Sequence, residues 1–176
     1  TVEDWKNLSK SYYEASTEVN GTKIPILWGT DAVHGHNNVI GATIFPHNIA
    51  LGATRNPELL KKIGSAVAKE VASTGIIWTF APTIAVPQND LWGRTYEGYS
   101  ENPELVSLLG KNFILGLQGD GVSFLDEMHI LATAKHFLGD GGTDNGIDQG
   151  DTIVNEITLK DIHGLPYYDA VDSCAL

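Results

Sequence analysis

Three short apolar segments, each followed at once by a polar cluster, constrain the fold of this chain more than any other feature. The segments cover residues 26–29, 76–81 and 130–134. Stretches with helical signals separate them, and strands that alternate with helices through short links favour a parallel sheet covered by helices. The carboxyl ends of parallel strands lie along one edge, where α/β folds gather their functional groups. The sequence therefore predicts an α/β fold whose polar clusters lie at that edge.

Helix start and stop signals place the helices between these segments. Asn56-Pro57-Glu58 and Asn102-Pro103-Glu104 each offer a capping side chain, a proline suited to the first turn and an early acidic residue. The first four residues resemble a capping box, and Asn20-Gly21 is expected to end that helix. Pro166 falls inside the last predicted helix and is expected to interrupt or kink it. The helices are predicted over residues 2–18, 57–74, 103–117 and from 158 onward.

Length and charge limit the classes of protein. The 176 residues suffice for one domain, taken here as residues 1–176. The chain contains no run of 18 apolar residues that would cross a membrane. Its 22 acidic and 11 basic residues give a net charge of −11 at pH 7, which argues against binding to the phosphates of nucleic acids. Neutral or cationic ligands suit this charge better.

The first polar cluster follows the segment that ends at Gly29. Asp31 lies just beyond that strand, where its carboxylate can accept hydrogen bonds from sugar hydroxyls. A turn-forming or helix-capping aspartate is an equally good interpretation of the local sequence. His34 and His36 alternate around Gly35, but no third ligand is spaced to complete a metal site. We therefore expect structural histidines here and no bound metal.

The second cluster is Trp92-Gly93-Arg94, in a loop that begins near Pro82. A guanidinium presents five fixed donors that suit vicinal hydroxyls, and an indole offers a flat apolar face on which sugar rings stack. The competing interpretation is a surface salt bridge from Arg94 to Asp90 or Glu97. Local sequence favours the salt bridge when this cluster is taken alone.

The third cluster, Lys135-His136, follows an almost wholly apolar segment that is typical of a strand buried on both faces. Burying two basic groups there without a function would be costly, so these residues are predicted to act as hydrogen-bond donors or acid/base groups. Successive residues of a regular strand point to opposite faces. Joint use of both side chains therefore predicts an irregular backbone, through a cis peptide bond or a bulge.

The glycine-rich and aspartate-rich stretch 139–150 fits none of the usual phosphate or calcium motifs. Asp144 stands where the dinucleotide fingerprint needs its last glycine, and no Lys-Ser or Lys-Thr pair follows as in a P-loop. The acidic residues do not alternate as an EF-hand loop requires. The stretch is predicted to be one long rim loop, and the sequence predicts no cofactor.

Taken together, the motifs resemble the N-terminal barrel domain of glycoside hydrolase family 3, in its β-glucosidase and exo-β-glucanase branch. The resemblance covers nearly the whole chain in order. The stretch Gly139 to Gly142 lacks the histidine that the N-acetylglucosaminidase branch carries in its loop, which disfavours that branch. The motifs that carry the resemblance lie at residues 26–35, 43–46, 80–82, 92–97 and 134–140.

The resemblance implies a role for each cluster. Asp31, Arg94, Lys135 and His136 match the family residues that hold the non-reducing terminal glucosyl unit of a β-glucoside or β-glucan. The nucleophile and the acid/base residue are expected beyond Leu176, so the sequence predicts no catalytic residue in this chain. The implied fold is roughly the first half of a (β/α)₈ TIM-like barrel, since a full barrel needs about 250 residues. The rest of the barrel and a second domain are the implied partners, and the implied location is periplasmic or secreted.

The implied activity is retaining hydrolysis of a β-glucosidic bond through a covalent glucosyl-enzyme. Two other classes of protein stay open from sequence. A non-catalytic carbohydrate-binding or degenerate module would keep the four sugar contacts while lacking the nucleophile. An unrelated doubly wound α/β protein would instead form an open sheet around a different ligand.

Overall fold

The strands of this protein are short and run parallel. In the computed structural model, which describes residues 1–18 and 23–174, β1 (Gly29–Thr30) pairs with β2 (Trp78–Thr79), with Gly29 opposite Trp78. The third predicted strand lies beside β2 but forms only isolated parallel bridges, at Leu131 and Lys135. The three apolar segments therefore lie next to one another in chain order, and regular pairing is much shorter than the sequence predicted.

The helices follow the predicted signals closely. The side chain of Asn56 accepts a hydrogen bond from the Leu59 amide, and Asn102 does the same for Leu105, so both predicted caps are confirmed. The stop expected at Asn20-Gly21 lies outside the described residues. The helices are α1 (Val2–Glu18), α2 (Asn48–Ala53), α3 (Pro57–Ala72), α4 (Pro103–Gln118), α5 (Glu156–Thr158) and α6 (Leu165–Cys174).

The break predicted around Pro166 is confirmed and takes the form of a wider helical turn. A π-helical segment, η5 (Leu159–Gly164), connects α5 to α6 without a loop. Proline has no amide hydrogen and its ring crowds the carbonyl four residues earlier, so a regular α-helix cannot pass through it undisturbed. The π-helical segment carries His163, which is buried.

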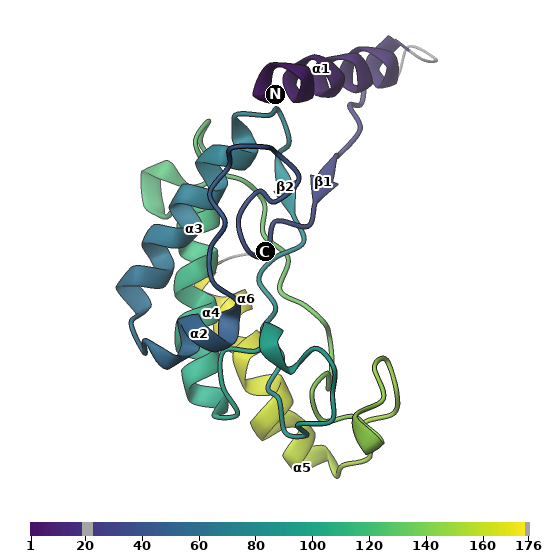
Figure 1. Cartoon of the computed structure of the whole chain (residues 1–176), viewed down its shortest axis with the longest axis vertical. Helices are drawn as coiled ribbons and strands as arrows, with labels where there is room; N and C mark the ends of the chain where they lie inside the picture. Colours follow the sequence, from purple (N-terminus) through teal and green to yellow (C-terminus); the bar gives the residue numbers. More distant parts are fainter. Residues whose placement is uncertain (19–22, 175–176) are drawn as a thin grey trace.

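The hydrophobic core lies between the strands and the helices α3 and α4 (Figure 1). Leu60, Val67, Leu109 and Leu117 from these two helices are completely shielded from solvent. The helices can approach closely because Gly116 has no side chain. A Cβ at this position would stand only 2.1 Å from a backbone carbonyl of α3. The two helices form a closely packed layer beside the strands.

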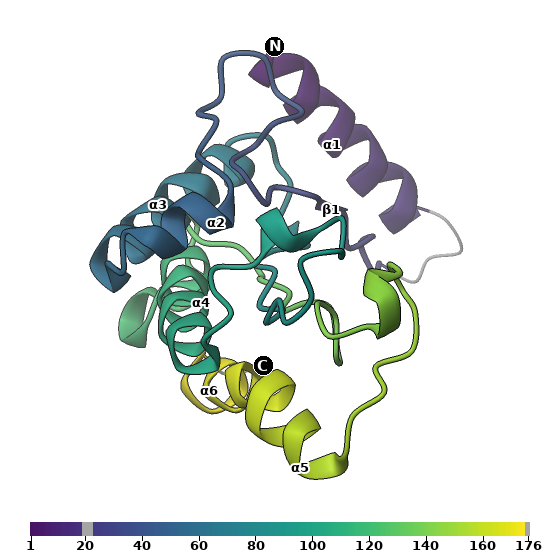
Figure 2. The ribbon, with the colours of Figure 1, turned by 60° about the horizontal axis from the view of Figure 1, so that its bottom comes forward.

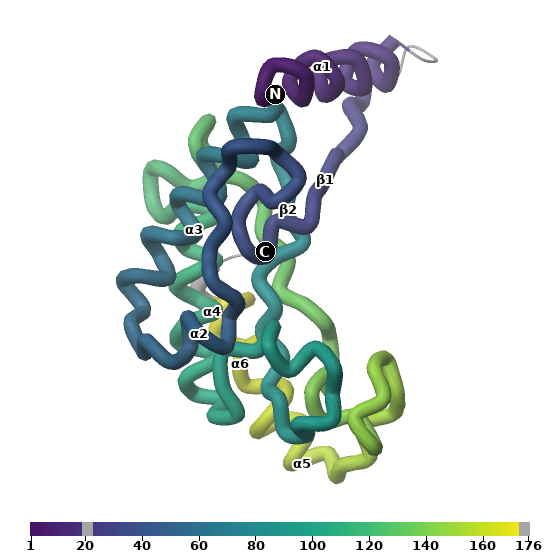
Figure 3. The backbone as a smooth tube through the Cα atoms, in the orientation of Figure 1, coloured from purple at the N-terminus to yellow at the C-terminus, as the bar shows by residue number. Residues whose placement is uncertain are grey.

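Helices α1 and α5 lie at opposite ends of the molecule. Figures 1 and 2 both place α1 at one end, and α5 with the start of α6 at the other. α1 has no buried residue and meets the rest of the chain through aromatic contacts, with Trp5 and Tyr12 against Trp28, and through hydrogen bonds of Ser9 and Ser16. The tube in Figure 3 shows the chain returning from α1 through β1 into the loop that precedes α2.

Candidate functional site

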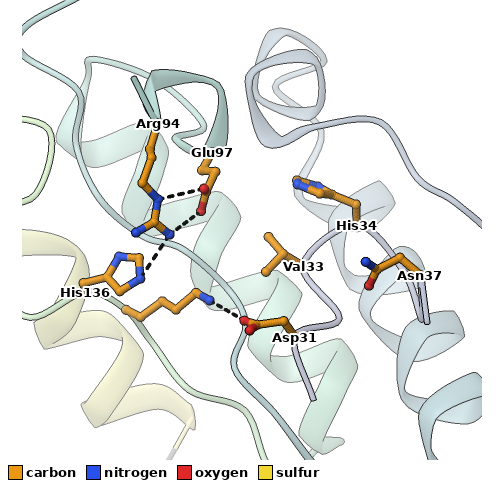
Figure 4. A pocket seen from close by; sticks show the side chains of 8 residues that line it. Asp31, Val33, His34, Asn37, Arg94, Glu97 and His136 are labelled. Carbon is orange, nitrogen blue, oxygen red and sulfur yellow. Dashed lines mark hydrogen bonds and ion pairs between the residues drawn. The ribbon is translucent and has the colours of Figure 1, made fainter. Parts of the chain in front are cut away.

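A polar pocket of about 390 Å³ opens at the sheet edge where the three clusters meet (Figure 4). It brings together all four residues singled out from sequence, although they come from three separate segments of the chain. Four further residues complete its lining. The pocket is lined by Asp31, Val33, His34, Asn37, Arg94, Glu97, Lys135 and His136.

The first cluster reaches the pocket through a tight turn after β1. Gly35 adopts a φ of +94°, and a Cβ there would stand 2.0 Å from the Thr43 carbonyl, so glycine is needed for the chain to fold back. His34 faces the pocket, whereas His36 is buried and pairs with the Thr74 hydroxyl at 3.1 Å. The turn therefore sends only one of the two histidines to the site.

Arg94 and Glu97 form a bidentate ion pair across the 3-10 helix η2 (Thr95–Glu97), which Arg94 precedes and Glu97 ends. Arg94 Nε donates to Glu97 Oε1 at 2.8 Å and Nη2 donates to Oε2 at 2.9 Å. The Glu97 side chain is only 11% exposed, and the Thr83 hydroxyl also donates to it at 3.2 Å. The expected partner is therefore correct, but the pair lies in the pocket rather than on the surface.

The ion pair fixes the charge of both groups. Burial alone raises the pKa of Glu97, but the hydrogen bonds and positive charge of Arg94 outweigh burial and hold the pKa of that carboxyl below its ordinary value of 4.5. The same hydrogen bonds raise the pKa of Arg94. Both groups are therefore charged at neutral pH.

Lys135 and His136 both line the pocket although they are successive residues. The peptide bonds Lys135–His136 and Phe137–Leu138 are both cis, which confirms the irregular backbone predicted here. Lys135 Nζ donates to Asp31 Oδ1 at 2.8 Å and thereby joins the first cluster to the third. The Lys135 side chain is mostly buried, whereas the Asp31 side chain stays 64% exposed to solvent.

His136 is held from both sides of its ring. Its Nδ1 lies 2.6 Å from Asp140 Oδ2, and its Nε2 lies 3.2 Å from Arg94 Nη2. A guanidinium can only donate, so Nε2 must accept this hydrogen bond. The hydrogen-bond pattern therefore assigns the imidazole proton to Nδ1, where it faces the Asp140 carboxylate.

The opposite side of the pocket is uncharged at neutral pH. Burial lowers the pKa of His34 below its ordinary value of 6.5, and the neighbouring His47 lowers it further. The two rings are 3.9 Å apart between centroids, and Tyr96 packs edge-on against His47. Val33 and the exposed Asn37 complete this side.

Trp92 is a correction to the sequence prediction. Its indole is 1% exposed and donates to Asp148 Oδ1 at 2.9 Å, so it supports the loop from inside and offers no face to a sugar ring. A Trp-Gly-Arg motif does not distinguish a stacking indole from a buried one. The loop 139–150 is confirmed as mostly irregular, with a short 3-10 helix η4 (Asp144–Gly146) within it.

Sequence reasoning missed three polar residues of the site or its surroundings. His34 was assigned a structural role, Asn37 was not considered, and Asp140 was placed on a rim loop with no role of its own. The spacing of Asp140, four residues after His136 in a glycine-rich turn, was the available signal. Among the described residues, no three histidine, cysteine, aspartate or glutamate side chains gather as a metal site.

Comparisons with known proteins show the family to which this chain belongs. Residues 1–176 match the model of the glycosyl hydrolase family 3 N-terminal domain, and the chain belongs to this family. The predicted fold class is confirmed, because this domain has a TIM-barrel-like α/β fold and similar solved structures superpose on the chain. The alternative of an unrelated doubly wound protein is wrong.

Particular relatives include glycosidases from several organisms. The chain is 33% identical over 159 residues to a lysosomal β-glucosidase of Dictyostelium discoideum, covering 89% of this chain and 19% of the relative. It is 37% identical to a β-xylosidase of Formosa agariphila, covering 84% and 21%. The chain is 51% identical in sequence to an exo-1,3/1,4-β-glucanase from a Pseudoalteromonas species. Its crystal structure superposes on the chain with a TM-score of 0.93, and the match covers 97% of this chain and 22% of that protein. The chain thus spans about a fifth of the length of these proteins.

Proposed function

We propose that this chain is the sugar-holding part of a glycoside hydrolase that removes non-reducing terminal β-D-glucosyl residues with retention of configuration. One observation carries the proposal: Asp31, Arg94, Lys135 and His136 come from three separate segments of the chain and line one pocket. These are the residues that the family resemblance assigns to the terminal glucosyl unit. Their role as substrate contacts is part of this proposal.

The chemistry of the pocket suits a sugar. Each hydroxyl of a hexose both donates and accepts a hydrogen bond, so a site that holds it needs donors and acceptors side by side. Arg94 and Lys135 supply donors, and the exposed carboxylate of Asp31 supplies acceptors. The ion pairs among these groups keep the buried charges compensated before a ligand binds.

The two carboxylates that line the pocket are both engaged as hydrogen-bond acceptors. Asp31 accepts from Lys135 and Glu97 from Arg94 in a bidentate pair. A retaining mechanism requires a nucleophilic carboxylate and an acid/base carboxyl group about 5 Å apart, with the nucleophile free to attack the anomeric carbon. We therefore propose that both catalytic groups lie outside residues 1–176 of this chain, which contributes the positioning of the sugar.

The test compares the protein at its natural full length with the chain of residues 1–176. We expect the full-length protein to hydrolyse an aryl β-glucoside and to release glucose with its β configuration, as measured by NMR of the first product. An aryl β-xyloside, assayed beside it, decides between the two sugars named among the relatives. A full-length protein that binds glucose but hydrolyses neither glycoside is the result that favours a non-catalytic carbohydrate-binding module.

The isolated chain of residues 1–176 is expected to bind or hydrolyse glucosides poorly, because the proposed catalytic groups are outside it. Apolar side chains such as Ile24, Ile26 and Ile77 are more than half exposed in this chain, so it is also expected to self-associate. Gel filtration and the same assay measure both properties. A monomeric and active chain would contradict the placement of catalysis elsewhere.

The location and partners follow as proposals from the same reasoning. Among the described residues, no helix is long and apolar enough to span a membrane. A relative from Salmonella typhimurium is named a periplasmic β-glucosidase, which supports a periplasmic or secreted location. Fractionation of cells that carry the natural gene tests this location. The partners we propose are the β-glucoside substrate and the remainder of the barrel with a second domain.

A further inference from the structure

The Asp140 carboxylate lies behind His136, on the side of the ring away from Arg94. We propose that Asp140 is a positioning residue, which fixes the imidazole proton of His136 on Nδ1 and keeps Nε2 facing Arg94. This inference rests on the proposed sugar-binding function of the pocket. It concerns a residue that does not itself line the pocket.

The geometry around His136 carries the proposal. Asp140 Oδ2 stands 2.6 Å from Nδ1, and the Asp140 side chain is only 13% exposed. Arg94 occupies the other ring nitrogen as a donor at 3.2 Å. A proton on Nε2 would place two donors face to face, so the only tautomer that satisfies both contacts carries its proton toward Asp140.

The backbone on both sides of Asp140 is anchored. The Gly139 carbonyl accepts a hydrogen bond from the Thr152 hydroxyl at 2.8 Å. The Gly141 carbonyl accepts from the amides of Gln88 and Asn89, at 2.7 and 3.1 Å. The loop therefore holds the carboxylate in place before any ligand arrives, which is what a positioning group requires.

Asp140 also lies close to the π-helical segment. Burial lowers the pKa of His163 in η5, and the negative charge of Asp140 opposes that effect. His163 is therefore uncharged at neutral pH and offers Asp140 no positive charge. Tyr167, from α6, packs edge-on against Phe137. Burial raises the pKa of Tyr167, and the negative charge of Asp140 raises it further. The elements around Asp140 leave His136 as its close ring-nitrogen partner at 2.6 Å.

The contacts form one continuous chain across the charged side of the pocket. Asp140 holds His136, His136 accepts from Arg94, and Arg94 is clamped by Glu97. Loss of the Asp140 carboxylate would remove the negative charge beside Nδ1–H and allow the ring to turn or to change tautomer. Arg94 would then lose an acceptor, and two sugar contacts would shift together.

A double-mutant cycle in the full-length protein tests this inference. We expect Asp140→Ala to lower kcat/KM for an aryl β-glucoside about 100-fold, because small misplacements of binding groups have effects of this size. In the His136→Ala background the same change is expected to matter less than about three-fold, because Asp140 acts through His136. Asp151→Ala, which removes an exposed carboxylate just after the same loop, is the control and should leave kcat/KM unchanged.

The result in the two backgrounds separates this inference from a merely structural role. Equal losses from Asp140→Ala in both backgrounds would overturn it. If Asp140→Ala does not fold, as judged by thermal unfolding, Asp140→Asn enters the same cycle, since the amide keeps the size and weakens the acceptor. The same dependence on His136 is then expected.

A second readout does not need activity. ¹⁵N NMR of histidine-labelled protein, assigned with His136→Gln, is expected to show the Nδ1–H tautomer in the natural protein and a mixture after Asp140→Ala. A natural protein with the proton on Nε2 would overturn the inference. A protein that shows the expected tautomers but hydrolyses no β-glycoside would reject the proposed function and still support the role of Asp140.

Discussion

The two sides of the pocket differ in how firmly their side chains are held. On the charged wall, formed by Arg94, Glu97, Lys135 and His136, each side chain has an ion-pair or hydrogen-bond partner within 3.2 Å. The neutral wall, formed by Val33, His34 and Asn37, is built by a turn and packed rings. Figure 4 shows Arg94, Glu97 and His136 on one side, and His34 with Asn37 on the other.

This difference shows that one side of the pocket is preorganised for a polar ligand before the ligand binds. Side chains that are already paired lose little freedom when a sugar binds, so the charged wall offers oriented donors at low entropic cost. The neutral wall contributes shape and surface instead. Substitutions in the charged wall should therefore have larger effects on turnover than substitutions in the neutral wall.

Replacement of Arg94 is expected to have the largest effect. Arg94→Ala removes a sugar donor and leaves the buried Glu97 carboxylate without its bidentate partner. We expect kcat/KM to fall about 1000-fold, or about 4 kcal/mol, in the full-length protein. Arg94→Lys should restore little, because an ammonium cannot form the two parallel hydrogen bonds. Steady-state kinetics measure this effect, and full activity of the lysine variant would contradict it.

Asp31→Asn should reduce activity while leaving stability almost unchanged. The variant keeps the size of the side chain but weakens the acceptor offered to sugar hydroxyls and to Lys135. We expect kcat/KM to fall about 100-fold, because hydrogen bonds to charged groups contribute about 1.5–3 kcal/mol. Since Asp31 is 64% exposed, the free energy of unfolding should change by less than about 1 kcal/mol. Chemical denaturation beside the assay separates the two effects.

The buried histidines should make the fold sensitive to acid. Burial lowers the pKa values of His36 and His163 below 6.5, so both stay neutral in the folded state while the unfolded chain takes up protons. Their contribution to stability is present above pH 6.5 and is lost as the pH falls below that value. Denaturation at pH 8, 6.5 and 5 measures the loss. His36→Gln, which cannot be protonated, should make the stability less dependent on pH over this range.

The smallest effect is expected on the neutral wall. Asn37 is exposed, so Asn37→Ala should raise KM about three-fold or less and leave kcat unchanged. Kinetics with the same aryl β-glucoside provide the measurement. A loss as large as that of Asp31→Asn would show that both sides of the pocket hold the sugar with similar strength.

Much of this arrangement could be predicted from the sequence because it depends on local signals. The Asn-Pro-Glu helix starts are confirmed, and so is the irregular backbone at Lys135-His136. A cap uses atoms within three residues of one another, so the chain carries the whole signal. Alternation of strands and helices likewise indicated which segments would end near one another.

Features that depend on distant contacts were beyond sequence reasoning. Trp92 is buried because Asp148, more than 50 residues away, accepts its indole hydrogen, and no local pattern reports that contact. Glu97 was expected at the surface because its burial depends on how η2 docks against Thr83. The regular pairing of β1 with β2 is only two residues long, which the longer apolar segments of the sequence did not indicate.

The ion pair between Lys135 and Asp31 has a consequence for the order of folding. These residues are 104 positions apart, so the chain must close a very long loop before the pocket exists. Helix α3 and helix α4 can form and pack before that closure, without any part of the sugar site. A sugar that binds here therefore recognises only molecules that have completed folding, and at 100 times its dissociation constant it would stabilise them by about 2.7 kcal/mol.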